Sequence, residues 1–199
     1  REKINKTHFV VDPFLGSGTT MICCKSKGIS SGGVEANDFF KFASETKLEW
    51  SLDIKILEME KNIILNLVEK QLSQYKWPTS SSQEVLPFEK SGYLDPNKYA
   101  QINRPKLLLE KYISNAPFTK LDLIKKCLLN HKWTDDRVKN FFFLSYATTV
   151  LPVSNVRYGP GFGVIKPKID VNVLTEFKKR LNRMISDMKN INKKYSLVN

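Results

Sequence analysis

The sequence predicts an α/β protein in which a short parallel β-α-β unit is followed by a mostly helical region. An apolar stretch that ends at Asp12 runs into a glycine-containing turn and then a helical segment, and a second short stretch ends at Glu35. The order strand, helix, strand predicts a parallel, right-handed unit. After Trp50 the apolar residues take a helical period, and we find no internal repeat.

The elements of the N-terminal unit follow from its apolar runs and glycines. We expect strands over 8–11 and 29–35, with a turn at Gly16 to Gly18 between the first strand and a helix. Gly28 closes that helix, since glycine is common just after a helix ends. A further helix begins at "ANDFF", where Asn37 or Asp38 supplies the cap. For Asp38 we prefer this role to a contact with a ligand.

Helical periodicity dominates the rest of the chain. We expect helices over 51–75, 104–115, 119–130 and 135–151 and a last one from about Asp170, with loops over 77–97 and 152–170. The apolar stretch before Pro152 is a doubtful third strand. A Thr119-x-x-Asp122 pattern predicts a capping box. The expected buried faces are Ile56, Met59, Ile63, Leu67 and Leu72 in the long helix and Val173, Phe177, Leu181, Met184 and Met188 in the last.

Composition restricts the class of protein. With 199 residues, 41% of them hydrophobic, the chain can bury a core. No apolar run is long enough to span a bilayer, and the start has no signal-peptide pattern, although a chain that opens on Arg1 suggests a missing native beginning. Three cysteines predict neither a disulfide framework nor a zinc site, which favours a reducing cytoplasm.

The net charge of +12 fits a polyanionic partner, most often nucleic acid. A lysine-rich composition without a charged partner explains it equally well. His8 and His131 have no paired nucleophile or metal partner in the sequence, so we expect both to have structural roles. We expect Cys23 and Cys24 to pack in the core.

The stretch "VVDPFLGSGTT" is the most informative of the chain. A glycine turn between a strand and a helix brings backbone N–H groups and the positive end of the helix close to an anion. It is neither a P-loop, since the Gly-Lys-Ser/Thr is absent, nor a full dinucleotide motif, since Met21 stands where the third glycine belongs. Glu35, at the end of the second strand, can accept both hydroxyls of a ribose. S-adenosylmethionine (AdoMet) carries both a ribose and a carboxylate and fits this pair.

"DPFLGSGTT", followed by a helix and "GGVEAN", closely resembles the AdoMet-binding motif of amino-directed DNA methyltransferases, which methylate the exocyclic amine of adenine or cytosine. The resemblance covers about Phe9 to Asn37 and implies a partial Rossmann-like AdoMet-binding unit. It places the following residues at the cofactor: Asp12, Pro13, Phe14, Gly16, Ser17, Gly18, Thr19, Glu35 and Asn37. Core packing is an equal alternative for Phe14.

The segment "VSNVRYGPGFGVIKPK" has a weaker similarity to one that precedes the catalytic half in some of these enzymes. Its cations can neutralise phosphates and its aromatic rings can stack on bases, so the expected DNA-binding residues are Arg157, Tyr158, Lys166 and Lys168. The alternative is a solvated linker between two helices.

The catalytic motif of the family, Asp/Asn/Ser-Pro-Pro-aromatic, presents a flipped base to the methyl donor. The chain contains no Pro-Pro, so we predict no catalytic residue in it and expect it to be inactive alone. Three explanations stay open. The chain is a fragment whose catalytic half follows Asn199, which we favour because the family order puts the catalytic motif downstream; or it works with a complementary methyltransferase subunit; or it is a non-catalytic AdoMet- or DNA-binding module of a restriction-modification-like system. Methylation of RNA guanine amines is a further alternative, although the "GTT" ending favours DNA.

The expected organisation is an AdoMet-binding part over 1–50, a helical insertion that helps to recognise DNA over 51–150, and a basic loop with a terminal helix over 151–199. We expect a cytoplasmic, nucleoid-associated prokaryotic protein with DNA as partner, no membrane association and no metal.

Overall fold

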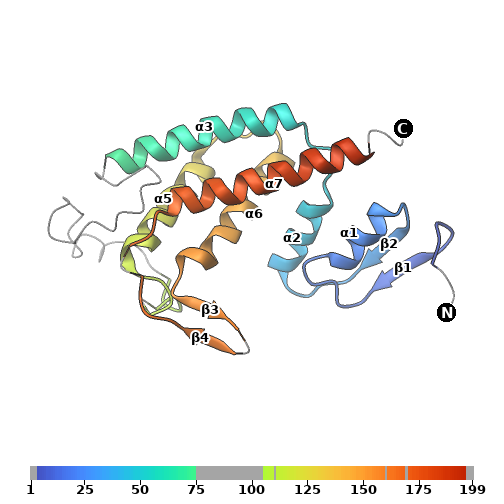
Figure 1. The fold of residues 1–199 in the computed structure, drawn as a ribbon, viewed down its shortest axis with the longest axis horizontal. Coiled ribbons are helices and arrows are strands. Elements are labelled where there is room, and N and C mark those ends of the chain that lie inside the picture. The colour runs from blue at the N-terminus through green and yellow to red at the C-terminus, as the bar shows by residue number, and fades with distance from the viewer. Residues whose placement is uncertain (1–3, 75–104, 110, 160, 169, 196–199) are drawn as a thin grey trace.

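The computed structural model describes residues 4–74, 105–109, 111–159, 161–168 and 170–195, and these form a mixed structure of helices and short strands (Figure 1). The N-terminal elements are β1 (Phe9–Asp12), α1 (Thr19–Ser26), β2 (Ser30–Gly33) and α2 (Asp38–Leu48). The remaining elements are α3 (Ile54–Ser73), α5 (Asn115–Asn130), α6 (Asp136–Val153), β3 (Val156–Tyr158), β4 (Phe162–Val164) and α7 (Val173–Tyr195). Among the described helices, none is long and apolar enough to cross a membrane.

The N-terminal strands form a two-stranded parallel sheet, as the order of elements predicts. β1 pairs with β2 in parallel, with Phe9 opposite Ser30 and Asp12 opposite Gly33. Helix α1 makes the crossover and ends before Gly28, whose φ of 66° is the left-handed conformation that ends helices. The carboxyl ends of both strands therefore lie side by side, next to the start of α1.

Apolar side chains of this sheet lie in solvent. Phe9 and Val11 of β1 are 64% and 65% exposed, and Val34, just after β2, is 67% exposed. Parallel sheets normally have both faces covered. The described N-terminal unit thus has an uncovered apolar surface.

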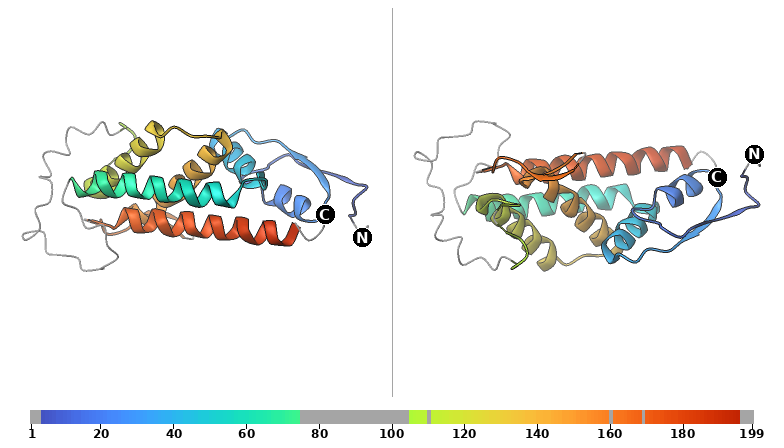
Figure 2. Two further views of the ribbon diagram at one scale, coloured as in Figure 1. Left: turned by 90° about the horizontal axis from the view of Figure 1, so that it is seen from above. Right: turned by 90° about the horizontal axis from the view of Figure 1, so that it is seen from below.

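The bundle of α3, α5, α6 and α7 contains the main core. In the views of Figure 2, α3 and α7 run side by side along the molecule, with α5 and α6 packed against them. The largest fully buried side chains include Leu57, Ile64, Leu72, Ile124, Leu128, Phe142, Phe177, Leu181 and Ile185. The expected face of the last helix is confirmed, with Met184 only half-buried. The sheet lies at the end of the bundle where α7 ends (Figure 1).

The predicted buried face of α3 is only partly right: Ile56 is half-buried and packs against the core, as expected. Met59, Ile63 and Leu67 are exposed, while Leu72 and a different stripe, with Ile64 and Val68, are buried. Helix α3 has two apolar stripes of helical period, so periodicity alone does not choose between them. The buried stripe includes Glu60, whose Oε2 lies 2.6 Å from Nε2 of His131. This pair satisfies the carboxylate and confirms a structural role for His131.

The predicted helix over 104–115 and the capping box are also wrong. Turns occupy the described residues from Pro105 to Ser114, and α5 begins at Asn115. Pro117 is tolerated because the first turn of a helix needs no N–H from it. Thr119 is therefore inside the helix, where its hydroxyl donates to the Asn115 carbonyl at 2.9 Å.

The expected loop over 152–170 contains a β-hairpin. β3 and β4 are antiparallel, with Val156 opposite Val164, and Gly159 and Gly161 lie between the two strands. The doubtful strand before Pro152 is helix α6, which includes that proline. The last helix begins at Val173, later than expected.

Two buried side chains fix the segment between the hairpin and α7. Asn155 is fully buried, and its Oδ1 accepts from the Lys168 N–H at 2.9 Å. The ammonium of Lys120 on α5 is buried and donates to both oxygens of Asp170 at 2.6 and 2.7 Å. Burial lowers the pKa of Lys120, and the carboxylate of Asp170 partly opposes that effect.

Candidate cofactor site at the turn after β1

The turn between β1 and α1 is held to the end of β2 by backbone bonds. The Leu15 N–H donates to the Val34 carbonyl at 3.0 Å, and the Val34 N–H donates to the Asp12 carbonyl at 3.0 Å. Oδ1 of Asp12 accepts from the Phe14 N–H at 3.0 Å, so this carboxylate shapes the start of the turn. Gly16 has a φ of 53°, in the left-handed region that favours glycine.

Glu35 closes the site from the β2 side. Its Oε2 accepts from the Gly16 N–H at 2.7 Å, and its Oε1 accepts from the Asn37 N–H at 2.8 Å. An ionised carboxylate has about four lone-pair sites, so it retains acceptor capacity for hydroxyl donors. The structure therefore brings together the glycine turn and the acidic residue that the sequence pairs.

The two glycines of the turn have different roles. A Cβ on Gly16 would meet only the Phe14 carbonyl oxygen, at 4.0 Å, which leaves space for a ligand. A Cβ on Gly18 would lie 2.8 Å from Cβ of Ser44 on α2. Glycine is therefore needed at position 18 because α2 occupies the space that a side chain would fill.

Helix α2 supplies two residues that are not predictable from the sequence. Besides Ser44, the ammonium of Lys47 donates to the Ser17 carbonyl at 2.8 Å and fixes the turn. Burial lowers the pKa of Lys47. No sequence signal identifies this pair, since both look like ordinary helix positions until α2 packs on the turn.

The start of α1 points its free backbone donors at this site. No side chain caps the helix at Gly18, and the first N–H groups of a helix lack intrahelical acceptors. Thr19, the first helical residue, is exposed. The helix dipole adds partial positive charge there, so a carboxylate is a suitable ligand.

The other predicted cofactor residues lie around this turn. Pro13 is exposed, and Phe14 is 88% exposed, so core packing is wrong for Phe14. Asn37 caps α2, because its Oδ1 accepts from the N–H groups of Phe39 and Phe40 at 3.0 and 3.2 Å. Of the two candidate caps, Asn37 is therefore the one that caps α2, and Asp38 is the first residue of the helix. In the helix after the turn, Cys24 is buried, whereas Cys23 is exposed, contrary to expectation.

The predicted DNA-binding residues lie apart from the turn, in and after the hairpin (Figure 1). Arg157 and Lys166 are exposed. Lys168 is half-buried, and its ammonium donates to the Pro152 carbonyl at 2.6 Å. The side chain of Tyr158 lies outside the described residues.

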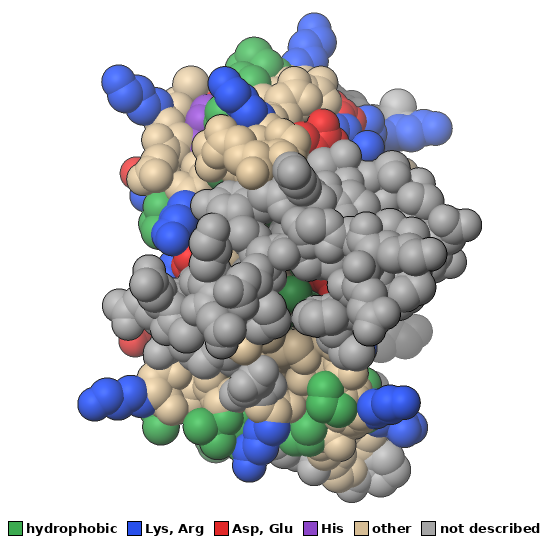
Figure 3. Space-filling view, turned by 90° about the vertical axis from the view of Figure 1, so that its left-hand side faces the viewer, with side chains coloured by type: hydrophobic (Ala, Val, Ile, Leu, Met, Phe, Trp, Pro, Cys, Tyr) green, Lys and Arg blue, Asp and Glu red, His purple; other side chains and the backbone are tan. Residues whose placement is uncertain are grey.

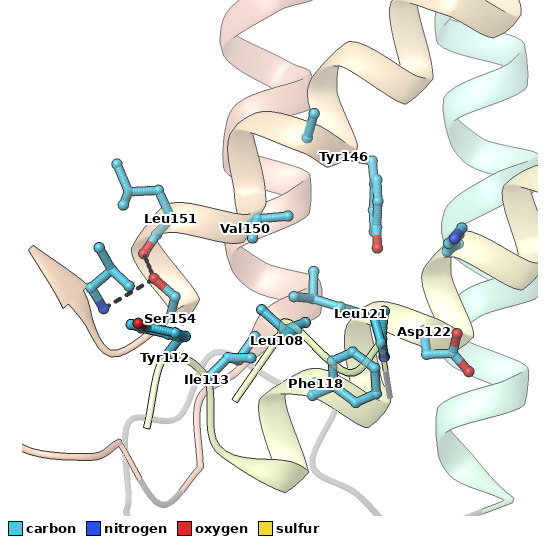
Figure 4. A pocket seen from close by; sticks show the side chains of 14 residues that line it. Leu108, Tyr112, Ile113, Phe118, Leu121, Asp122, Tyr146, Val150, Leu151 and Ser154 are labelled. Carbon is cyan, nitrogen blue, oxygen red and sulfur yellow. Dashed lines mark hydrogen bonds between the residues drawn. The ribbon is translucent and has the colours of Figure 1, made fainter. Parts of the chain in front are cut away.

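A separate cavity of about 570 Å³ lies between α5, α6 and the segment before α5 (Figure 4). Its wall is mainly apolar, with Leu108, Phe118, Leu121 and Val150, and the hydroxyl of Tyr146 points toward it. Burial, assisted by the charge of Asp122, raises the pKa of Tyr146 to about 12. Neither the turn nor Glu35 lines this cavity.

Comparison with known proteins gives a partial match. The chain is 39% identical over 70 residues to the type II methyltransferase M.MjaII of Methanocaldococcus jannaschii. This alignment covers 33% of the chain and 12% of that protein, so the chain spans about an eighth of the relative it matches. No family model matches the chain. No solved structure matches it either. The match supports a relationship to methyltransferases.

Proposed function

We propose that this chain is the AdoMet-binding part of a DNA methyltransferase that acts on the exocyclic amine of adenine or cytosine. The observation that carries the proposal is the contact between the Glu35 carboxylate and the Gly16 N–H at 2.7 Å. It joins the carboxylate that would accept the ribose hydroxyls to the turn that would bind the cofactor's carboxylate. The partial similarity to a type II methyltransferase supports the same class of cofactor.

The residues fit the cofactor. The carboxylate of AdoMet would meet the N–H groups at the start of α1, near Thr19, and its ribose hydroxyls would donate to Glu35. Phe14 offers an exposed aromatic ring at the edge of the same turn. When bound, AdoMet would supply an electrophilic methyl group on its sulfonium.

We also propose that the chain alone lacks the catalytic part of the enzyme. The Asp/Asn/Ser-Pro-Pro-aromatic motif that presents the base is absent from the sequence. The uncovered apolar surface of β1, with Phe9 and Val11 exposed, supports the same idea, because further strands and helices would cover it in a full parallel sheet. The catalytic groups would then come from a further segment or subunit.

The test is calorimetric titration of the chain with AdoMet. Glu35→Ala should weaken binding at least tenfold, since it removes the ribose acceptor and one support of the turn, which corresponds to about 1.4 kcal/mol. Asp38→Ala is the matched control, because Asp38 is a nearby exposed carboxylate that does not cap α2. Equal affinity for the wild type and Glu35→Ala would refute the role of Glu35.

A second assay distinguishes the alternatives. With labelled AdoMet, the chain alone should bind the cofactor and transfer no methyl group to duplex DNA. Transfer to DNA by the chain alone would refute its incompleteness. Transfer to RNA in preference to DNA would favour the RNA guanine-amine alternative.

A further inference from the structure

Helix α7 concentrates positive charge on a single element. It carries seven Lys and Arg residues and two acidic residues, a net charge of +5 out of +12 for the chain. The cations are Lys178, Lys179, Arg180, Arg183, Lys189, Lys193 and Lys194, and the acids are Glu176 and Asp187. The helix contains 23 of the 199 residues, so its charge density is far above the average of the chain.

The opposite side of the helix explains why the charges face outward. Val173, Leu174, Phe177, Leu181 and Ile185 are buried against the bundle. The exposed side holds Lys179, Arg183, Lys193 and Lys194, with Asn182, Ser186 and Asn190 among them. We call these seven residues the α7 basic face.

Acidic neighbours neutralise only part of the charge of α7. Glu176 pairs with Lys179 at 2.8 Å, and Glu58 of α3 pairs with Lys189 at 2.7 Å. Within the part of the chain that the structure describes, Arg183 has no ion pair. Asp187 is the acidic residue on the exposed side of the helix. Figure 3 looks onto the end of the molecule at which α7 begins and shows Lys and Arg side chains scattered around its edge, with some Asp and Glu side chains near them.

The chemistry of this face favours nucleic acid over protein. Among the described residues of α7, no large apolar side chain is exposed, and the centres of protein interfaces are depleted of lysine. Lys, Arg, Ser and Asn are the side chains that contact phosphate oxygens. From Lys179 to Lys194 the helix rises about 22 Å at ~1.5 Å per residue. Over that length duplex DNA presents roughly 13 negative charges at one per ~1.7 Å.

We infer that the α7 basic face binds the phosphate backbone of duplex DNA and positions it for the proposed methyltransferase. The inference rests on the proposed function for the choice of DNA. It adds a surface on α7 to the residues of the hairpin segment, Arg157 and Lys166, that the sequence predicts to contact DNA. Phosphate contacts carry no sequence information, so this surface supplies affinity and orientation.

The test is fluorescence anisotropy of the full chain with a labelled 24-base-pair duplex of mixed sequence over a series of KCl concentrations. Each phosphate contact contributes about 0.9 to the slope of log affinity against log salt. Lys179→Gln with Arg183→Gln should therefore lower the slope by about 1 to 2, because Lys179 exchanges Glu176 for a phosphate when it binds DNA. Lys179→Arg with Arg183→Lys should keep it, because the charges remain.

The matched control is Lys41→Gln with Lys132→Gln, which removes two exposed cations outside α7 and should leave the slope unchanged. Thermal melts of every variant check that the bundle is intact. An unchanged slope in the α7 variant, or an equal fall in the control, would overturn the inference. Stronger competition by duplex RNA than by duplex DNA would overturn the choice of partner.

AdoMet titration of the same samples separates this inference from the proposed function. The α7 variant should bind AdoMet as the wild type does, because the basic face does not include the turn. If the chain binds AdoMet but the α7 variant has the same salt dependence of DNA binding as the wild type, only the DNA-binding role of the α7 basic face is refuted. If the salt dependence of DNA binding falls in the α7 variant but the chain does not bind AdoMet, only the proposed function is refuted.

Discussion

At the scale of single residues, the turn after β1 shows which parts of a site sequence can reveal. Gly16 and Glu35 were predictable because a glycine turn followed by an acidic strand end is a local pattern. The contact of Gly18 with Ser44 was not predictable, since it depends on how α2 packs across the turn. Lys47 was missed for the same reason.

Gly18→Ala tests that packing. The substitution forces a side chain onto a residue with a φ of 85° and places its Cβ 2.8 Å from Cβ of Ser44. We expect a loss of about 2 kcal/mol or more in the free energy of unfolding, measured by urea denaturation. Gly163→Ala is the control, because nothing lies within 4 Å of its Cβ, and it should cost less than about 1 kcal/mol. Equal losses would contradict the close approach of α2.

Tyr146 gives a prediction about pH. Its folded pKa of about 12 lies above the unfolded value of about 10, because burial and the charge of Asp122 disfavour the phenolate. The folded state therefore keeps the proton longer. The stability from this group is full below about pH 10 and is lost as the pH rises through about 12.

The measurement is the phenolate absorbance at 295 nm. Subtracting the titration of Tyr146→Phe from that of the wild type isolates one of the seven tyrosines. The difference should have a midpoint near 12, provided that the chain stays folded by circular dichroism. A midpoint near 10 would show that the Tyr146 hydroxyl is well solvated.

At the scale of elements, α3 shows where periodicity fails. Both of its stripes recur at helical spacing, and the one that includes Met59 is exposed. The buried stripe has a polar member, Glu60, which His131 contacts from beyond the end of α5. This contact joins residues 71 positions apart, so no local pattern contains it. The hairpin was missed for a related reason, since its strands have three residues each.

Two neighbouring isoleucines of α3 test this orientation. Ile64 is fully buried, and Ile63 is 39% exposed. Ile64→Ala should lower the free energy of unfolding by about 2–5 kcal/mol, the usual cost of emptying a buried site. Ile63→Ala changes the same chemical group one position away and should cost less than about 1 kcal/mol. Urea denaturation of both variants measures the two losses. A larger loss for Ile63→Ala than for Ile64→Ala would support the stripe predicted from the sequence.

At the scale of the whole molecule, the two ends of the described chain differ in completeness. The bundle of α3, α5, α6 and α7 has a continuous core. The β1–β2 sheet has two strands and exposed apolar side chains. The β-α-β order predicts the parallel pairing correctly, and helical periodicity finds α3, α6 and α7. The arrangement of the bundle depends on long-range contacts such as Lys120 with Asp170, which have no local signal.

Three surfaces of the molecule have different proposed functions. The turn after β1 would hold the cofactor, the α7 basic face would hold the DNA backbone, and the uncovered face of β1 would meet the catalytic part. The cavity beside Tyr146 belongs to none of them. The AdoMet-binding turn is the central claim, because the proposed roles of the other two surfaces assume that the chain is part of a methyltransferase.

The most direct test is an NMR titration of the isotope-labelled chain with AdoMet, in which the chemical shifts of the backbone amides are measured. We predict saturable shifts at Gly16, Thr19 and Asn37, and no shift of the amides that line the bundle cavity. Shifts centred on Tyr146 and Phe118 would place the ligand in the cavity instead. Those shifts, or the absence of any at saturating AdoMet, would contradict a cofactor site at the turn.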